Sequence, residues 1–168
     1  MKKTVLIITI ICTTILSVVK AQNTISKKEF NKTLQAYFDT KNALAKDNVS
    51  LANTSAKNLI ASLATFPVKS LSTAQQTLWK IQSAQIKKAA NAMVVQKDLK
   101  EQRKSFWPLS SAMLKLTQEL KLNATDVFVQ YCPMAKKSWL NDVEDVQNPF
   151  YGSQMYDCGE VTETITKK

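Results

Sequence analysis

Apolar residues recur every three or four positions from about residue 26 to residue 122, which is the spacing of one face of an α-helix. Capping residues and a proline divide this stretch into four amphipathic segments joined by short connections. The pattern predicts an all-α fold, an antiparallel up-down-up-down four-helix bundle over residues 22 to 125. The residues expected in its core are Phe30, Leu34, Tyr37, Phe38, Ala45, Val49, Ala52, Ala56, Leu59, Leu63, Leu78, Ile81, Ile86, Ala89, Met93, Phe106, Leu109, Met113, Leu116 and Leu120.

Local signals place the ends of the first two helices. Ser26 followed by Glu29 is typical of a capping box, which predicts that the first helix covers residues 27 to 46. The second helix is expected to begin at residue 47 or 48 and to end before Pro67, because the residue before a proline avoids helical geometry.

The third and fourth helices have signals of the same kind. The third is expected to start after residue 70 or 72 and to run to about residue 96. Asp98 with Glu101 predicts the start of the fourth. Pro108 lies inside this helix and predicts a kink, since proline removes a backbone hydrogen bond.

Helical periodicity is absent from the C-terminal part of the chain, residues 126 to 168. Residues 127 to 131 are β-branched and aromatic, which predicts a short extended segment. Asn141 is suited to cap a single helical turn that extends to residue 146. We expect this part to form an irregular cap that packs on one end of the bundle within the same domain.

The N-terminus is typical of a signal peptide. Lys2 and Lys3 precede an apolar run that ends at Val19, and Ala21 provides a small residue for cleavage. We expect residues 1 to 21 to be removed on export, which leaves no membrane span. A retained membrane anchor is the alternative, for which the apolar stretch is short and rich in threonine.

Composition excludes several classes of enzyme. The 168 residues include no histidine, so histidine-dependent nucleophilic catalysis and histidine zinc sites are absent. The two glycines, Gly152 and Gly159, leave the rest of the chain without a glycine-rich phosphate loop. The formal net charge is +10, but the lysines are scattered and do not alternate with stacking aromatic residues. We therefore expect neither an enzyme nor a nucleic-acid-binding protein.

Each cysteine of the C-terminal part has a methionine nearby: Cys132 with Met134, and Cys158 with Met155. In an extended segment, residues two apart point to the same face, and in a helical turn residues three apart are neighbours. The two segments could therefore present two thiolates and two thioethers to one ion. Such soft ligands select Cu(I) or Ag(I), and zinc is less favoured.

A disulfide is the competing interpretation of the same cysteines. A bond between Cys132 and Cys158 would close a loop of about 26 residues and stabilise the chain by roughly 3 kcal/mol. Exported proteins commonly use cysteines in this way. In that case Met134 and Met155 would be packing residues.

The C-terminal motifs also occur in a recognisable order. They are Cys132-Pro133-Met134-Ala135, Trp139-Leu140, Asn148-Pro149-Phe150-Tyr151-Gly152 and Met155-x-x-Cys158-Gly159. This order resembles the signature of a domain-of-unknown-function family of exported Gram-negative proteins. The same domain is appended to adaptor subunits of heavy-metal efflux systems of the resistance-nodulation-division type.

The resemblance implies a periplasmic location, a role in copper handling, and an efflux adaptor or another envelope protein as partner. Some relatives carry histidine before the first motif, where this chain has Tyr131, so a metal site here would rely on sulfur. With the resemblance included, soft-metal binding by Cys132, Met134, Met155 and Cys158 is preferred over a non-catalytic, disulfide-stapled interaction module.

Four further motif residues are expected to support the cap. Trp139 and Tyr151 should pack it onto the bundle, with shielding of a copper site as the alternative. Pro149 and Gly152 should set a turn that brings Met155 back toward Cys132.

Overall fold

The structure is a computed structural model that describes residues 2–167, with side chains from residue 24 onward. The predicted signal peptide, residues 1 to 21, lies outside the described side chains. Among the residues that the structure describes, no helix is both long and apolar enough to cross a membrane.

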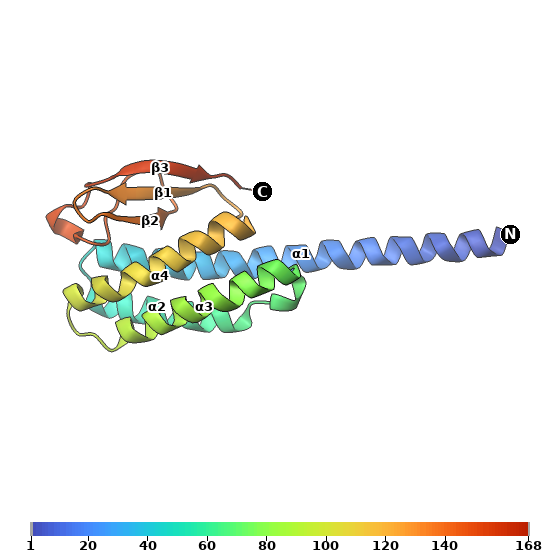
Figure 1. Ribbon diagram of the computed structural model, residues 1–168, viewed down its shortest axis with the longest axis horizontal. Coiled ribbons are helices and arrows are strands. Elements are labelled where there is room, and N and C mark those ends of the chain that lie inside the picture. The colour runs from blue at the N-terminus through green and yellow to red at the C-terminus, as the bar shows by residue number, and fades with distance from the viewer. Residues whose placement is uncertain (1, 168) are drawn as a thin grey trace.

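Four helices make up most of the fold: α1 (Lys2–Ala45), α2 (Val49–Thr65), α3 (Thr73–Val94) and α4 (Leu99–Leu120). A short 3₁₀ helix, η1 (Val68–Ser70), joins α2 to α3. Helices that follow one another along the chain pack side by side, as Figure 1 shows. The prediction of four helices is therefore confirmed.

Side-chain caps begin three of the helices where the sequence predicts them. Asn48 accepts a hydrogen bond from the Leu51 amide at 2.9 Å at the start of α2. Ser72 begins α3 with a complete capping box, and Asp98 begins α4. Helix α4 continues through Pro108.

The predicted start of the first helix is wrong. Ser26 lies inside α1 and is buried, so it caps no helix. Its hydroxyl instead contacts the Ser70 hydroxyl at 2.5 Å, which joins α1 to η1. The local capping signal is real in the sequence, but a helix that already continues on the N-terminal side has no free end to cap.

Most of the predicted core residues are buried, with one clear error in α3. Ile81 is 58% exposed, whereas Trp79 is buried and its ring stacks on Phe66 with centroids 3.8 Å apart. The buried face of α3 is therefore rotated relative to the predicted stripe. A bulky aromatic ring buries more apolar area than isoleucine, which favours this rotation.

The C-terminal part contains a sheet, so the all-α prediction holds for the helices and is wrong for this part of the chain. Three strands, β1 (Val127–Cys132), β2 (Lys137–Asn141) and β3 (Glu160–Ile165), pair antiparallel in the order β2-β1-β3. Only β1 coincides with the predicted extended segment. The edge strand β3 exposes most of its residues, which are largely threonine and glutamate. It therefore lacks the alternation of apolar and polar residues by which a strand is recognised in a sequence.

The sheet packs on the helices through buried polar and aromatic contacts. The Tyr37 hydroxyl accepts a hydrogen bond from the Leu140 amide at 3.0 Å and lies 2.8 Å from the Ser110 hydroxyl. These three residues belong to α1, β2 and α4. Burial raises the pKa of Tyr37 well above its ordinary value, so its hydroxyl stays neutral.

Asn141 ends β2 and is fully buried, so the predicted helical turn after it is wrong. Its Oδ1 accepts a 2.5 Å hydrogen bond from Lys41 Nζ, and its Nδ2 donates to Gln130 Oε1 at 3.1 Å. Gln130 Nε2 in turn donates to the backbone carbonyls of residues 143 to 145. Side-chain hydrogen bonds, and not a helix, therefore shape this loop.

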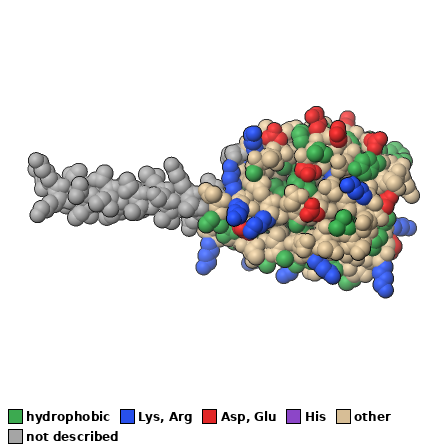
Figure 2. All heavy atoms as spheres, turned by 180° about the vertical axis from the view of Figure 1, so that it is seen from behind, with side chains coloured by type: hydrophobic (Ala, Val, Ile, Leu, Met, Phe, Trp, Pro, Cys, Tyr) green, Lys and Arg blue, Asp and Glu red, His purple; other side chains and the backbone are tan. Residues whose placement is uncertain are grey.

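Charge is distributed unequally between the helices and the sheet. Residues 24 to 125 carry 16 basic and 6 acidic side chains, whereas residues 126 to 168 carry 4 basic and 7 acidic ones. On the face in Figure 2, acidic side chains gather mostly along the upper side, over the sheet, and basic ones along the lower, helical side. The net positive charge therefore belongs to the helical part.

Candidate functional site

The fold brings the two C-terminal cysteines together. Cys132 is the last residue of β1 and is fully buried, while Cys158 is half-buried and lies two residues before β3. Strands β1 and β3 are paired, with Tyr131 opposite Glu160. The two Sγ atoms lie 2.8 Å apart, and both cysteines are free thiols.

The two thiols differ in acidity. Burial raises the pKa of Cys132, but hydrogen bonds to its sulfur from the Cys158 thiol and from the Ala135 amide, at 3.4 Å, outweigh burial and leave the pKa below its ordinary value. The pKa of Cys158 is raised, because its S–H donates to Cys132. The first proton lost by the pair therefore leaves a thiolate at Cys132.

Met134 does not share an extended face with Cys132, so that part of the spacing argument is wrong. The chain turns directly after β1, where the Lys136 amide donates to the Cys132 carbonyl at 2.8 Å. Met134 lies in this turn and is 62% exposed. The Tyr151 hydroxyl donates to its backbone carbonyl at 3.4 Å.

Met155 follows a second 3₁₀ helix, η2 (Gly152–Gln154), and is 38% exposed. The Cys158 amide donates to the Met155 carbonyl at 3.2 Å, so the two residues belong to one turn. Among the residues that the structure describes, no three His, Cys, Asp or Glu side chains gather at one point.

Asn148 ties the Asn-Pro-Phe-Tyr-Gly motif to the cysteine pair. Its Oδ1 accepts hydrogen bonds from the amides of Phe150, at 2.8 Å, and Tyr151, at 3.3 Å. Its Nδ2 donates to the Cys158 carbonyl at 2.8 Å. One buried amide side chain therefore fixes both the turn and the backbone at Cys158.

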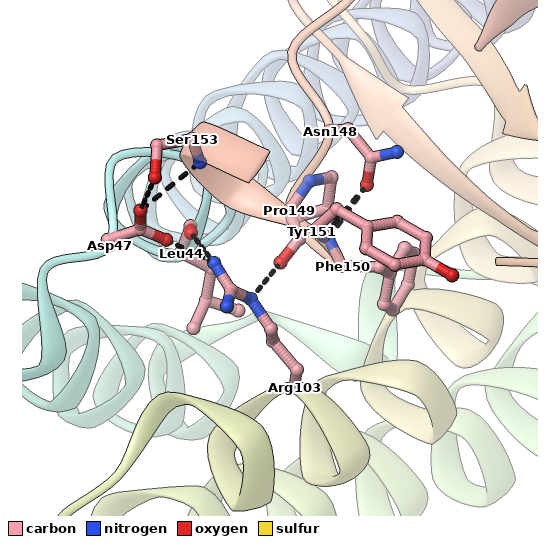
Figure 3. Close-up of polar contacts among 8 residues, drawn as sticks. All are labelled: Leu44, Asp47, Arg103, Asn148, Pro149, Phe150, Tyr151 and Ser153. Carbon is pink, nitrogen blue, oxygen red and sulfur yellow. Dashed lines mark hydrogen bonds and ion pairs between the residues drawn. The ribbon is translucent and has the colours of Figure 1, made fainter. Parts of the chain in front are cut away.

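Arg103 joins this turn to the helices (Figure 3). It rises from α4 and donates through Nε to the Pro149 carbonyl at 2.9 Å, and through Nη2 to the Leu44 carbonyl at 2.8 Å and Asp47 Oδ1 at 2.5 Å. The other carboxylate oxygen of Asp47 accepts from the amide and the hydroxyl of Ser153. The hydrogen bonds from Ser153 and the guanidinium hold the pKa of Asp47 below its ordinary value.

Sequence reasoning missed Asp47 and Arg103 as residues that hold the site. One signal was present: Arg103 is the only arginine in the chain, beside 22 lysines. A guanidinium can satisfy several acceptors in one plane, which an ammonium cannot. A lone arginine in a lysine-rich chain is therefore a candidate for such a position.

Both glycines occupy positions that a side chain would not fit. Gly152 has φ +58°, and a Cβ there would lie 2.0 Å from Asp47 Oδ1. Gly159 has φ +149°, and a Cβ there would lie 2.9 Å from the Tyr131 carbonyl oxygen. The turn before Met155 and the passage from Cys158 into β3 therefore both depend on glycine.

The remaining predicted support residues lie around the same turn. Trp139 is fully buried, donates through Nε1 to Gln130 Oε1 at 2.9 Å, and packs edge-on against Phe150 with ring centroids 6.0 Å apart. Pro149 is buried and Tyr151 is half-buried. Trp139 thus joins the sheet to the turn.

Comparison with known proteins identifies the family. The family described as "Protein of unknown function (DUF3347)" matches residues 33–125, more than half of the chain. The chain therefore belongs to this family. The match covers the helices after the start of α1 and ends before β1. Neither the curated proteins nor the solved structures contain a match to this chain.

Proposed function

We propose that this member of the DUF3347 family is an exported, non-catalytic protein that binds Cu(I) or Ag(I) through Cys132 and Cys158. Met134 and Met155 supply additional thioether ligands. The observation that carries the proposal is the approach of the two cysteine sulfurs to 2.8 Å, in a pair whose neighbouring turns each bear an exposed methionine.

The chemistry of the donors supports a soft ion. Thiolates and thioethers favour Cu(I) over oxygen-seeking cations such as Mg²⁺ or Ca²⁺. The lowered pKa of Cys132 makes a thiolate available, and the thiolate is the form that binds metal. Zinc usually takes a third or fourth ligand from Cys, His or a carboxylate, and such a group does not gather with the pair among the described residues.

Methionine exposure supports the thioether ligands. Met93 and Met113 are fully buried in the helical core, as packing residues should be. Met134 and Met155 are 62% and 38% exposed instead, and each lies within three residues of a cysteine. Their exposure would let a partner reach a metal ion held by these thioethers.

Metal binding requires the sulfurs to separate. With metal–sulfur bonds of about 2.3 Å, tetrahedral ligands lie about 3.8 Å apart, against 2.8 Å in the metal-free pair. Cys132 is held at the end of β1, while Cys158 lies between a turn and Gly159. Cys158 is therefore the ligand that moves.

Location and partner extend the proposal. The signal-peptide pattern and the family resemblance favour the periplasm, where the protein would buffer Cu(I) or deliver it to a heavy-metal efflux adaptor. The helices, arranged as an up-down-up-down bundle, would serve as the scaffold. Exchange among thiolates and thioethers transfers the ion without a redox step on the protein.

Anaerobic titration of the mature protein, residues 22 to 168, with Cu(I) against a competing chelator tests the proposal. We expect one equivalent to bind tightly, and Cys132→Ser and Cys158→Ser each to abolish this binding. A reduced wild-type protein that binds less than one equivalent would overturn the proposal. Parallel titrations with Ag(I) and Zn²⁺ establish the order of preference.

The distance between the two cysteine sulfurs also supports a second candidate function, in which they form a disulfide. A disulfide requires about 2.05 Å between the sulfurs, so a movement of less than an ångström would staple β1 to the segment before β3. Two thiols would give up two protons and two electrons to a disulfide-donating oxidant. The protein would then be a stapled envelope interaction module. Intact mass before and after alkylation without reductant distinguishes this state from the dithiol.

A further inference from the structure

A basic hollow lies beside the proposed metal site. It has a volume of about 450 Å³ and lies between the first turns of α4 and the turn that joins β1 to β2. The residues that line it are Lys100, Arg103, Lys104, Met134, Ala135, Lys137, Phe150, Tyr151 and Gln154. Met134 thus belongs both to this hollow and to the proposed ligand set.

Two of the four cations in the hollow have no acidic partner. Arg103 is paired with Asp47, and Lys104 with Glu101 at 2.5 Å. Lys100 and Lys137 form no ion pair within the described part of the chain, and no described carboxylate lines the hollow. The hollow is therefore a surface of uncompensated positive charge.

The other lining is apolar and well anchored. Lys137 Nζ lies 5.1 Å from the centre of the Phe150 ring, so the lysine is positioned over an aromatic floor. The same turn is held by Arg103 through the Pro149 carbonyl. A fixed apolar floor with charges at its rim suits a ligand that carries both carboxylates and an apolar side chain.

We propose that this hollow is the docking site for an acidic peptide segment of a partner protein. Its carboxylates would pair with Lys100 and Lys137, and an apolar side chain would lie against Phe150 and Met134. The inference rests on the proposed function in one respect: the docked partner would be the one that gives or accepts the metal, at Met134.

The shape favours a peptide over a free inorganic anion. A phosphate ion gains little from an apolar floor and binds best where several donors converge on it. The two unpaired lysines instead belong to different elements, α4 and β2, and are 37 positions apart in the chain. Long-range attraction by the basic helical part would also bring an acidic segment to this surface.

Fluorescence anisotropy with a labelled peptide of sequence Asp-Glu-Leu-Asp-Asp-Leu-Glu-Asp tests the inference on the mature, reduced, metal-free protein. The double variant Lys100→Gln/Lys137→Gln should weaken binding roughly tenfold. The matched control is Lys80→Gln/Lys87→Gln, which removes the same charge from a different hollow between α2 and α3. This control should change the affinity less than about twofold.

Zero-length carbodiimide cross-linking, followed by peptide mapping, locates the contact. Cross-links to Lys100, Lys104 or Lys137 support the inference. Equal loss of affinity in both double variants, cross-links spread over the helical lysines, or displacement of the peptide by inorganic phosphate would overturn it. The peptide with Asn and Gln in place of Asp and Glu should not bind.

Cu(I) titration of the same three proteins, the wild type and the two double variants, separates the two proposals. Binding of one equivalent of Cu(I) without peptide binding would refute the docking site alone. Peptide binding at Lys100 and Lys137 without Cu(I) binding would refute the proposed function and leave an acidic-peptide surface with no metal to transfer.

Discussion

Arg103 donates to Asp47 Oδ1 through Nη2 at 2.5 Å, which joins α4 to the residues that link α1 to α2. The same guanidinium reaches the Pro149 carbonyl, so one side chain connects two helices with the turn beside the cysteines. The position of the proposed metal site relative to the helices therefore depends on a small number of polar contacts.

Replacement of that arginine should show this dependence. Arg103→Lys keeps the charge, but a compact ammonium cannot reach the three acceptors that the extended guanidinium spans, and we expect the free energy of unfolding to fall by about 1–2 kcal/mol. Urea denaturation measures the loss. Lys104→Gln removes only an exposed ion pair and should cost less than about 0.5 kcal/mol. Equal losses in the two variants would argue against the role of Arg103.

Asp47 should make the protein sensitive to acid. Its pKa is lower in the folded protein, through Ser153 and Arg103, than in the unfolded chain. Its stabilising contribution is therefore present above the unfolded pKa, near 4, and is lost as the pH falls further. Unfolding free energies measured from neutral pH downward should fall less steeply for Asp47→Asn than for the wild type. Parallel curves would contradict the prediction.

Lys41 should make the stability of the protein depend on pH in the alkaline range. Burial, opposed in part by Asp142, lowers its pKa to about 8 from 10.5. Between these values the unfolded chain binds more protons, so stability should rise with pH. We expect wild type to gain about 2 kcal/mol over Lys41→Met between about pH 7 and pH 10. Urea denaturation at both pH values measures it, and an equal change in the two proteins would contradict it.

Gly152→Ala should be among the most destabilising single substitutions. The residue has φ +58°, and its Cβ would lie 2.0 Å from Asp47 Oδ1 and 2.2 Å from Arg103 Nη2. We expect a loss of at least about 2 kcal/mol, from backbone strain and from disruption of the ion pair. Asp47→Ala should cost less when added to Gly152→Ala than in the wild type. In Gly152→Ala the contacts of Asp47 are already disturbed, and removal of its carboxylate relieves the clash with the new Cβ. Additive losses in urea denaturation would contradict this coupling.

The methionines should separate metal affinity from stability. Met134→Leu and Met155→Leu remove thioethers from exposed positions, so each should weaken Cu(I) affinity by about tenfold while thermal stability stays unchanged. Met113→Leu, in the core, should do the reverse and lower stability by about 1 kcal/mol. Unchanged Cu(I) affinity in both exposed variants would restrict the site to the cysteines.

Features determined by neighbouring residues could be predicted from the sequence. The caps at Asn48, Ser72 and Asp98 act over three residues, and their helices begin where expected. Ser26 carries an equally good signal, yet α1 continues through it. The strand β3 lies at the edge of the sheet and buries few of its side chains, so its sequence does not alternate between apolar and polar residues. It is a strand because it pairs with β1, which its own sequence does not reveal.

In the candidate site too, local motifs could be predicted from the sequence, whereas long-range contacts could not. The cysteine and methionine pairs are visible as short motifs, but Met134 lies in a turn after Cys132 and not in the extended segment assumed for it. The contacts of Asp47 and Arg103 cross between residues that are 56 positions apart. No local sequence pattern predicts a contact between residues so far apart in the chain. A lone arginine indicates only that one position requires a guanidinium, and it does not identify the partners.

The strand order places the cysteine pair at the end of a ladder of backbone amides. β1 is hydrogen-bonded on both sides, whereas β3 is held by β1 alone. Cys132 ends β1, and Cys158 leads through Gly159 to Glu160, where the ladder opens. A metal ion or a disulfide at the sulfurs would clamp this open end, and we expect hydrogen–deuterium exchange along β3 to slow when the pair is occupied or oxidised.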